Sequence, residues 1–152
     1  MDRESIAIVL TVAILSSVFV HAGVHSDWYS VVRPPSAPPP LIFALTWCIL
    51  YTSLAYSLSH TRVPILHYIH LLSGSLWCLQ FFVFHHACSS IGTSLVVMWT
   101  AMVLVVEHEP WRWYLIPLVM WCSLAVYLNA EACSLSINHI RNCDTPSANR
   151  RA

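Results

Sequence analysis

Charge is scarce in this sequence. Its 152 residues include seven arginines, no lysine and seven acidic residues, so charged residues make up only 9% of the chain. A soluble domain carries about 25% charged residues, whereas 57% of this chain is hydrophobic. These proportions exclude an ordinary soluble domain and indicate a membrane protein. The formal net charge is zero and basic residues do not cluster, which argues against a nucleic-acid partner.

Motifs typical of common enzymes and transporters are also missing. The three glycines form no phosphate-binding loop, and the apolar segments contain no chain of carboxylates and no inverted repeat. The six cysteines include no CxxC pair, and Cys48, Cys78 and Cys122 lie deep in apolar runs. We therefore expect reduced, structural thiols rather than a disulfide framework, and neither hydrolytic catalysis nor ion coupling is indicated.

Five apolar segments can be drawn, at about residues 6–23, 41–59, 63–84, 87–106 and 111–132. Segments of this length, at about 1.5 Å per helical residue, cross a hydrocarbon core of about 30 Å. The turns at 60–62, 85–86 and 107–110 are short, which favours antiparallel neighbours. The sequence thus predicts an all-α, polytopic bundle of five transmembrane helices over residues 1–138, followed by a polar tail, 139–152. The first segment could instead be a signal peptide, but no cleavage site leads from it into a soluble domain.

Five of the nine prolines lie between Pro34 and Pro40, between the first two segments. Proline fixes φ and cannot donate a backbone hydrogen bond, so this run predicts a stiff, extended strap. The strap would close one mouth of the bundle as a lid. Pro40 suits the first turn of the second helix. Arginines divide almost evenly between the two ends, although the arginines of the tail favour a cytosolic C-terminus.

Seven tryptophans are many for this length. Those at segment ends fit an interfacial belt, and those near mid-segment are expected to face a cavity or another helix, because a buried indole N–H needs a partner. The end set is Trp28, Trp111 and Trp113; the middle set is Trp47, Trp77, Trp99 and Trp121. Helical spacing groups Trp47 with Tyr51, Gly74 with Trp77, and Trp121 with Ala125, Leu128 and Asn129. These stripes could line an aromatic pocket for a flat apolar ligand, although plain helix packing gives the same spacing.

Nine histidines raise the alternative of a metal or haem site. His67 with His70, and His21 with His25, have spacings that place each pair on one helix face, and His85-His86 and Glu107-His108-Glu109 add possible ligands. Most of these residues lie at segment ends, where neutral imidazole is stable without a metal, so we expect no metal site. Glu131 should reach the interface opposite Trp111.

Several motifs occur together in an order typical of one family. They are Trp28-Tyr29, Arg33-Pro34, Pro38-Pro39, Phe43, Trp47 and Leu50-Tyr51, then FVH at 19–21, LWCLQFF at 76–82 and LIPLVMWCSLAVYLN at 115–129. Over about residues 16–138 the chain resembles the TspO/MBR family, that of the translocator protein or peripheral-type benzodiazepine receptor. The resemblance implies a five-helix bundle, often homodimeric, whose pocket opens beneath the loop between the first two helices.

The resemblance also implies a ligand and a site. Family members bind porphyrins, sterols and benzodiazepine-type compounds, so protoporphyrin IX or haem is the expected ligand and no cofactor is required. The ligand-binding residues implied here are Trp47, Tyr51, Gly74, Trp77, Trp121 and Ala125, and the lid residues are Trp28, Arg33, Pro34, Pro38 and Pro39. In bacterial relatives, tryptophans matching Trp47 and Trp121 are associated with light-dependent porphyrin breakdown. Eukaryotic relatives occur in the outer mitochondrial membrane, which makes an intracellular membrane the expected location.

The sequence departs from the family pattern at several of these places. Ser36 stands where the family has a tryptophan, Gly74 replaces an asparagine, and the strap is one residue shorter. Ala130 and Ser134 replace the tyrosine and arginine of the sterol-associated motif, which favours a porphyrin over a sterol. We expect a receptor or carrier for a flat hydrophobic ligand. The alternatives are a small membrane adaptor with a degenerate pocket, and haem or metal transport through His67 and His70.

Overall fold

The computed structural model describes residues 1–107 and 113–144, and this part of the chain contains helices and no strand. The all-α prediction is therefore confirmed. The predicted turn beyond Glu107, the residues Trp111 and Arg112, and the end of the tail lie outside the described residues. The elements are α1 (Arg3–Val24), α2 (Asp27–Val32), α3 (Pro40–Ser59), α4 (Ile65–Cys78), the π-helical segment η1 (Leu79–Val83), α5 (Ser90–Val106), the 3₁₀ turn η2 (Trp113–Leu115) and α6 (Ile116–Asp144).

Four helical stretches of the described chain are long and apolar enough to cross a membrane. They are Arg3–Val24, Pro40–Ser59, Ile65–Val83 and Trp113–Asn142, and the shorter apolar helix Ser90–Val106 accompanies them. The chain is a multi-pass integral membrane protein. Because α5 has only 17 residues, the count of five spans stays a prediction.

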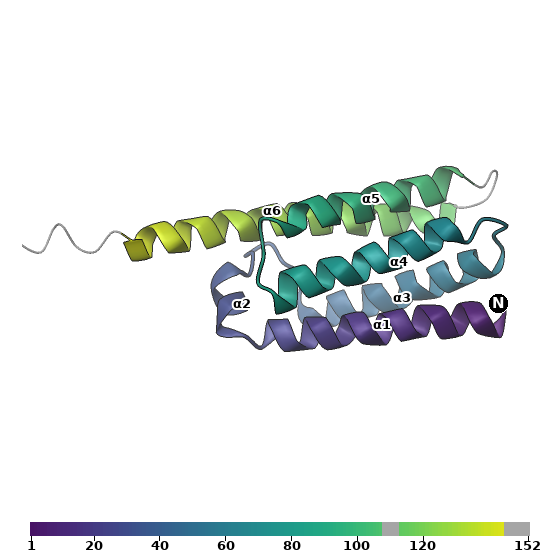
Figure 1. Ribbon diagram of the computed structural model, residues 1–152, viewed down its shortest axis with the longest axis horizontal. Helices are drawn as coiled ribbons and strands as arrows, with labels where there is room; N and C mark the ends of the chain where they lie inside the picture. Colours follow the sequence, from purple (N-terminus) through teal and green to yellow (C-terminus); the bar gives the residue numbers. More distant parts are fainter. Residues whose placement is uncertain (108–112, 145–152) are drawn as a thin grey trace, which may run out of the picture.

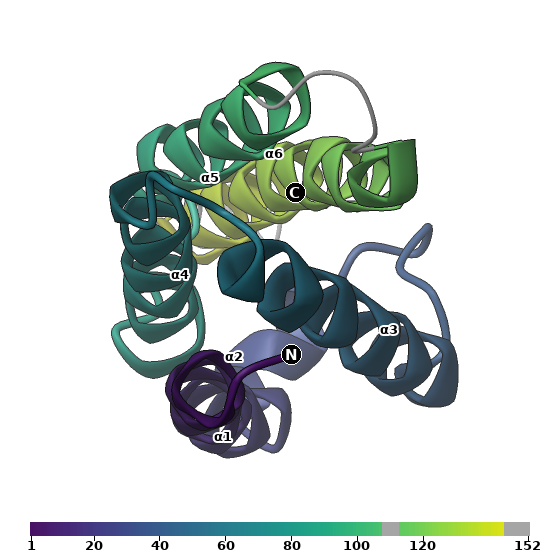
Figure 2. The same cartoon turned by 90° about the vertical axis from the view of Figure 1, so that its right-hand side faces the viewer.

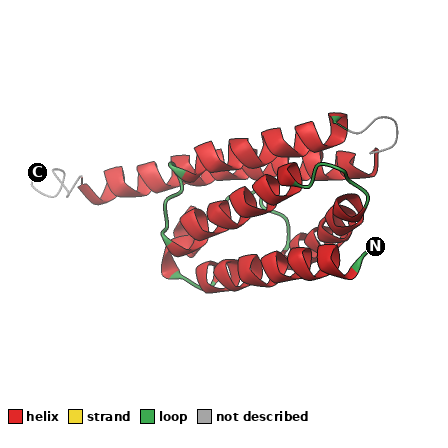
Figure 3. Cartoon of the chain, turned by 45° about the vertical axis from the view of Figure 1, so that its right-hand side comes forward, coloured by secondary structure: helices red, strands yellow, loops and turns green. Residues whose placement is uncertain are grey.

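The helices run alternately up and down along one common direction (Figures 1 and 3). The N-terminus and the turn between α3 and α4 lie at one end of the bundle, and α2 lies at the other end beside α6. Viewed along the bundle, α5 packs on α4 and α6, while α1 contacts α3 and α4 on the other side (Figure 2). We call the end that carries α2 the strap end and the opposite one the N-terminal end.

Helix α4 is the hub of the polar contacts between helices. Four of its side chains bond to four different helices, which ties each of the longer helices to α4 without any charge pair among them. The bonds are Ser75 Oγ to Ser16 Oγ of α1 (3.1 Å), His67 Nε2 to Ser57 Oγ of α3 (2.8 Å), His70 Nδ1 to Thr100 Oγ1 of α5 (2.9 Å) and Trp77 Nε1 to Asn129 Oδ1 of α6 (2.7 Å).

Helix boundaries differ from the predicted segments for local reasons. Helix α4 begins at Ile65 because Pro64 precedes its first turn. Its end widens into η1, where the Phe84 N–H donates to the Leu79 carbonyl five residues back. Helix α5 begins at Ser90, three residues later than predicted. Helix α6 continues twelve residues past the predicted end at 132, because no proline or glycine interrupts it before Pro146.

A short helix that the sequence did not predict precedes the proline run, and the run itself contains one turn. Residues 27–32 form α2, whose N-cap Ser26 accepts a hydrogen bond from the Tyr29 N–H at 3.2 Å. A turn follows, in which the Ala37 N–H donates to the Pro34 carbonyl at 3.0 Å. Pro40 opens α3, as predicted. Val32 is buried in α2 (1% exposed), ahead of the proline run, and the run is bent by the one turn rather than extended throughout.

One prediction about cysteine is wrong. Cys88, in the turn before α5, forms a disulfide with Cys133 of α6, and their Cα atoms lie 4.7 Å apart. The two cysteines are separated by 45 residues, and no spacing motif in the sequence indicates that they pair. Cys48, Cys78 and Cys122 are free thiols, as expected.

Candidate functional site

Two aromatic pairs lie on α3 and α6. Trp47 and Tyr51, one turn apart on α3, have ring centroids 5.3 Å apart at 30°. Phe43, one turn earlier, meets Trp121 of α6 edge-on, with centroids 5.1 Å apart. All four rings are half-buried, and those of Trp47, Tyr51 and Trp121 rest on the buried core. The structure thus places three of the predicted site residues on two facing helices, with part of each ring open for further contact.

The indole N–H of Trp121 is buried and has no hydrogen-bond partner. An indole nitrogen is a donor only, and burying it without an acceptor costs about 1–3 kcal/mol. Trp121 therefore carries an unused donor next to aromatic rings. A ligand with a carbonyl, carboxylate or hydroxyl oxygen would satisfy it.

Two small predicted site residues lie on neighbouring helices. Gly74 of α4 is half-buried, and a Cβ added there would meet no atom within 4 Å. Ala125, one turn after Trp121 on α6, is also half-buried. A glycine beside open space between packed helices leaves room that a ligand or a larger side chain could fill.

Trp77 has a different environment from the other predicted site residues. It is 8% exposed, and its ring contacts Phe81 and Phe82 at centroid distances of 5.8 and 6.0 Å. Its N–H donates to Asn129, whose oxygen also accepts from Ser90 Oγ at 3.1 Å.

The amide nitrogen of Asn129 donates to the Ala87 carbonyl at 2.6 Å. Asn129 is 1% exposed, so three partners satisfy a buried amide and fix the turn before α5 against α6. Helical spacing identified Asn129 only as one member of a stripe and did not predict these hydrogen bonds. An asparagine in an apolar helix was the available signal.

Of the two remaining described tryptophans, one has the environment that was expected and the other does not. Trp113 is 69% exposed at the start of α6, which suits an interfacial ring. Trp99, in the middle of α5, is 60% exposed on the outside of the bundle, contrary to the expectation that it faces a cavity or helix. Helix α5 uses its other face against α4 and α6, so Trp99 points away from the bundle.

The histidine pair His67 and His70 does not converge on one point. His67 is fully buried against Ser57 of α3, whereas His70 bonds to Thr100 of α5 on another side of α4. Each ring connects two helices. Within residues 1–107 and 113–144, no group of three or more His, Cys, Asp or Glu side chains could hold a metal ion.

The predicted lid residues lie at the strap end. Trp28 stacks on His85 with centroids 4.6 Å apart and interplanar angle 14°, and it meets Phe81 edge-on. His85 has a left-handed backbone, with φ of 58°, in the turn after η1. Tyr29 packs on Phe82. The lid is therefore anchored on η1 and the following turn.

The second half of the strap is tied to α6. Ser36 Oγ donates to a Glu131 carboxylate oxygen at 2.5 Å, which confirms that Glu131 reaches the strap end. Pro34 is buried and Pro38 is half-buried, while Arg33 and Pro39 are exposed. Burial raises the pKa of the Tyr29 phenol above its usual value, an effect that the Arg33 charge partly offsets.

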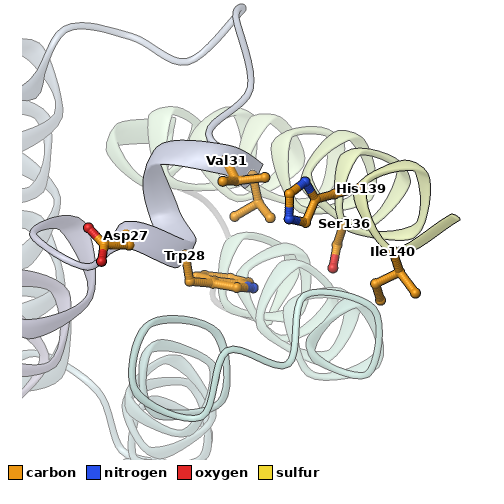
Figure 4. Close-up of a pocket in the computed structure, with 7 residues that line it drawn as sticks. Asp27, Trp28, Val31, Ser136, His139 and Ile140 are labelled. Atoms are coloured by element: carbon orange, nitrogen blue, oxygen red, sulfur yellow. The ribbon is translucent and has the colours of Figure 1, made fainter. Parts of the chain in front are cut away.

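A cavity of about 320 Å³ lies outside the bundle, between α2 and the C-terminal part of α6. Figure 4 shows Trp28 and Val31 of α2 on one side of it, and Ser136, His139 and Ile140 of α6 on the other. None of the predicted ligand-binding residues on α3, α4 or α6 lines this cavity. It shares only Trp28 with the predicted lid.

Comparison with known protein families identifies the family to which the chain belongs. A family model described as the TspO/MBR family matches residues 5–135, from the start of α1 to beyond the disulfide on α6. The chain belongs to the TspO/MBR family. A search of curated protein sequences gives no match. The family resemblance noted in the motifs is thus confirmed over most of the chain.

Two departures from the TspO/MBR pattern acquire a structural meaning. Ser36, in place of a tryptophan, bonds the strap to Glu131. Gly74, in place of an asparagine, leaves open space on α4. The first substitution exchanges a large ring in the lid for a polar tie, and the second leaves a predicted ligand-binding position on α4 without a side chain.

Proposed function

We propose that this TspO/MBR-family protein binds a flat hydrophobic ligand of the porphyrin class between α3 and α6, and that it carries or senses this ligand in the membrane. The observation that carries the proposal is the buried Trp121 N–H without a partner, next to half-buried rings on the facing helix. Membership of a family associated with porphyrin and sterol binding supports the same ligand class.

The chemistry of the site favours a porphyrin over a sterol. Trp47 and Tyr51 together offer aromatic surface on which a large planar ring can stack. A porphyrin also carries carboxylates, which accept strongly from an N–H donor in a dry site. The open space beside Gly74 would accommodate the edge of a wide ring. A sterol lacks both the planar π-system and the carboxylates.

The strap would act as the lid of this site. Its two anchors are the rings of Trp28 and Tyr29 on η1, and the bond from Ser36 to Glu131. Both anchors lie at one end of the bundle, so the ligand would enter from the strap end when the second anchor opens. Five transmembrane spans and a homodimer, both typical of the family, belong to the same proposal.

Titration with protoporphyrin IX tests the proposal. The purified protein in detergent is titrated while tryptophan fluorescence is followed, and wild type is compared with Trp47→Phe and Trp121→Phe. We expect saturable quenching at micromolar concentrations in wild type. Each variant should bind about tenfold more weakly, which corresponds to about 1.4 kcal/mol.

Trp99→Phe is the matched control. It removes a tryptophan at mid-membrane depth that points away from the bundle, so affinity should stay at the wild-type value. Equal losses in all three variants would mean that quenching reports non-specific partition into the micelle. Absence of saturable quenching in a helical, folded sample would contradict porphyrin binding and would support the membrane-adaptor alternative.

A further inference from the structure

The disulfide between Cys88 and Cys133 lies at the strap end of the bundle. Cys88 is exposed in the turn between η1 and α5, and Cys133 is half-buried on α6. The free thiols Cys48, Cys78 and Cys122 all lie within helices that can span the membrane. Cys133 also lies within a helix of this kind, whereas Cys88 lies in a connecting turn.

The disulfide joins elements that other contacts already hold together. Asn129, one turn before Cys133 on α6, bonds to the Ala87 carbonyl and to Ser90, on either side of Cys88. Glu131, between them on α6, accepts from Ser36 of the strap. One short stretch of α6 therefore holds the turn before α5 through hydrogen bonds and a covalent bond, and the strap through one hydrogen bond. The noncovalent contacts bring the two sulfurs together before they are oxidised.

We infer that the strap end of the bundle faces an oxidising compartment, and that the N-terminal end faces the reducing cytosol. Protein disulfides persist in oxidising compartments and are rare where thiols are kept reduced. Because the helices run alternately up and down, the compartment assigned to one end of the bundle determines the side on which each connecting segment lies. The strap and the C-terminal part of α6 lie at the disulfide's end, whereas the N-terminus and residues 60–64 lie at the other (Figure 1). This orientation is opposite to the one that the arginines of the tail favour.

The oxidation follows thiol–disulfide exchange with an oxidised dithiol protein of that compartment. One disulfide bond of the oxidant breaks and one forms between Cys88 and Cys133. The two electrons and the two thiol protons pass to the oxidant, which leaves as a dithiol. No other reactant is required.

The first arm of the test asks whether the two cysteines are joined in the cell. Full-length protein is expressed in eukaryotic cells, its free thiols are blocked with N-ethylmaleimide under denaturing conditions, and the sample is reduced and treated with maleimide-polyethylene glycol. We expect two adducts that appear only after reduction. Cys88→Ser and Cys133→Ser should each abolish both adducts, and Cys48→Ser, the matched control at a free thiol, should keep both. Absence of adducts in wild type would overturn the inference.

The second arm asks which end faces which compartment. Epitope tags are placed at the N- or the C-terminus, and cells are stained after digitonin opens only the plasma membrane, or after complete permeabilisation. The N-terminal tag should be stained under both conditions, and the C-terminal tag only after complete permeabilisation. Staining of the C-terminal tag in digitonin alone would overturn the orientation, even if the disulfide forms.

Discussion

At Gly23, helix α1 lies very close to the backbone of η1. A Cβ built at this position lies 2.4 Å from Phe82 Cβ, 2.6 Å from the Phe82 carbonyl oxygen and 2.7 Å from Phe82 Cα. Two of these atoms belong to the backbone of η1, so no change of rotamer relieves the clash. Gly23→Ala must therefore push α1 away from η1 by about 1 Å to restore ordinary contact distances. Overpacking of this kind costs about 1–3 kcal/mol.

The other two glycines provide matched controls. At Gly74 and Gly92 an added Cβ meets nothing within 4 Å, so alanine fits there and gains up to about 1 kcal/mol of helix propensity. Equilibrium unfolding in mixed dodecyl-maltoside and dodecyl-sulfate micelles, followed by circular dichroism, measures all three variants. Gly23→Ala should unfold at lower dodecyl-sulfate content than wild type, and Gly74→Ala and Gly92→Ala at equal or higher content. Wild-type stability of Gly23→Ala would refute the close approach of α1 to η1.

Three further predictions concern two hydrogen-bonded side chains and one buried phenol. Asn129→Leu leaves the buried Trp77 N–H without an acceptor, while Ser90 and Ala87 keep the hydrogen bond that joins them. It should lower the unfolding free energy by about 1–3 kcal/mol in the same micelle assay, whereas Ser123→Ala, which removes only a bond to the helix's own backbone, should change it little. Thr100→Val removes the hydroxyl partner of His70 and should cost about 0.6–1.7 kcal/mol, the range for hydrogen bonds between transmembrane helices; no loss would mean that His70 finds another partner. Because burial raises the pKa of Tyr29, its native state retains the phenolic proton to higher pH than the unfolded state does, so its contribution to stability is full below about pH 10 and declines above it. In an ultraviolet titration, Tyr29→Phe should have one late-ionising tyrosine fewer than wild type, and an equal number in both proteins would contradict the assignment.

The fold class followed from the sequence because composition and length decide it. Segments of about 20 apolar residues can only be helices in a bilayer, and the short turns fix their antiparallel order. The ends of the helices were harder to predict. The start of α4 depends on Pro64, and the end of α6 depends on the absence of a breaker before Pro146, which hydrophobicity does not register because residues 133–144 are polar.

The candidate site was predicted in part. Spacing on one helix placed Trp47 beside Tyr51, but the contact between Phe43 and Trp121 joins two helices and depends on tertiary packing. The disulfide and the partners of Asn129 are also long-range contacts, and no local pattern encodes them. The proline run was expected to be extended, since prolines dominate its composition, but it contains one turn. The short helix α2, in which Val32 is buried, precedes the run and was not predicted.

The role of Trp121 is the central claim, and its indole N–H gives a direct signal. Protein with ¹⁵N-labelled tryptophan would be titrated with protoporphyrin IX in micelles, with the Trp121 resonance assigned from Trp121→Phe. Because the donor has no partner in the free protein, we predict a saturable downfield shift of its proton as it gains an acceptor, while the resonance of Trp99, which points away from the bundle, stays in place. An unchanged Trp121 resonance at porphyrin saturation would show that the ligand does not bind between α3 and α6.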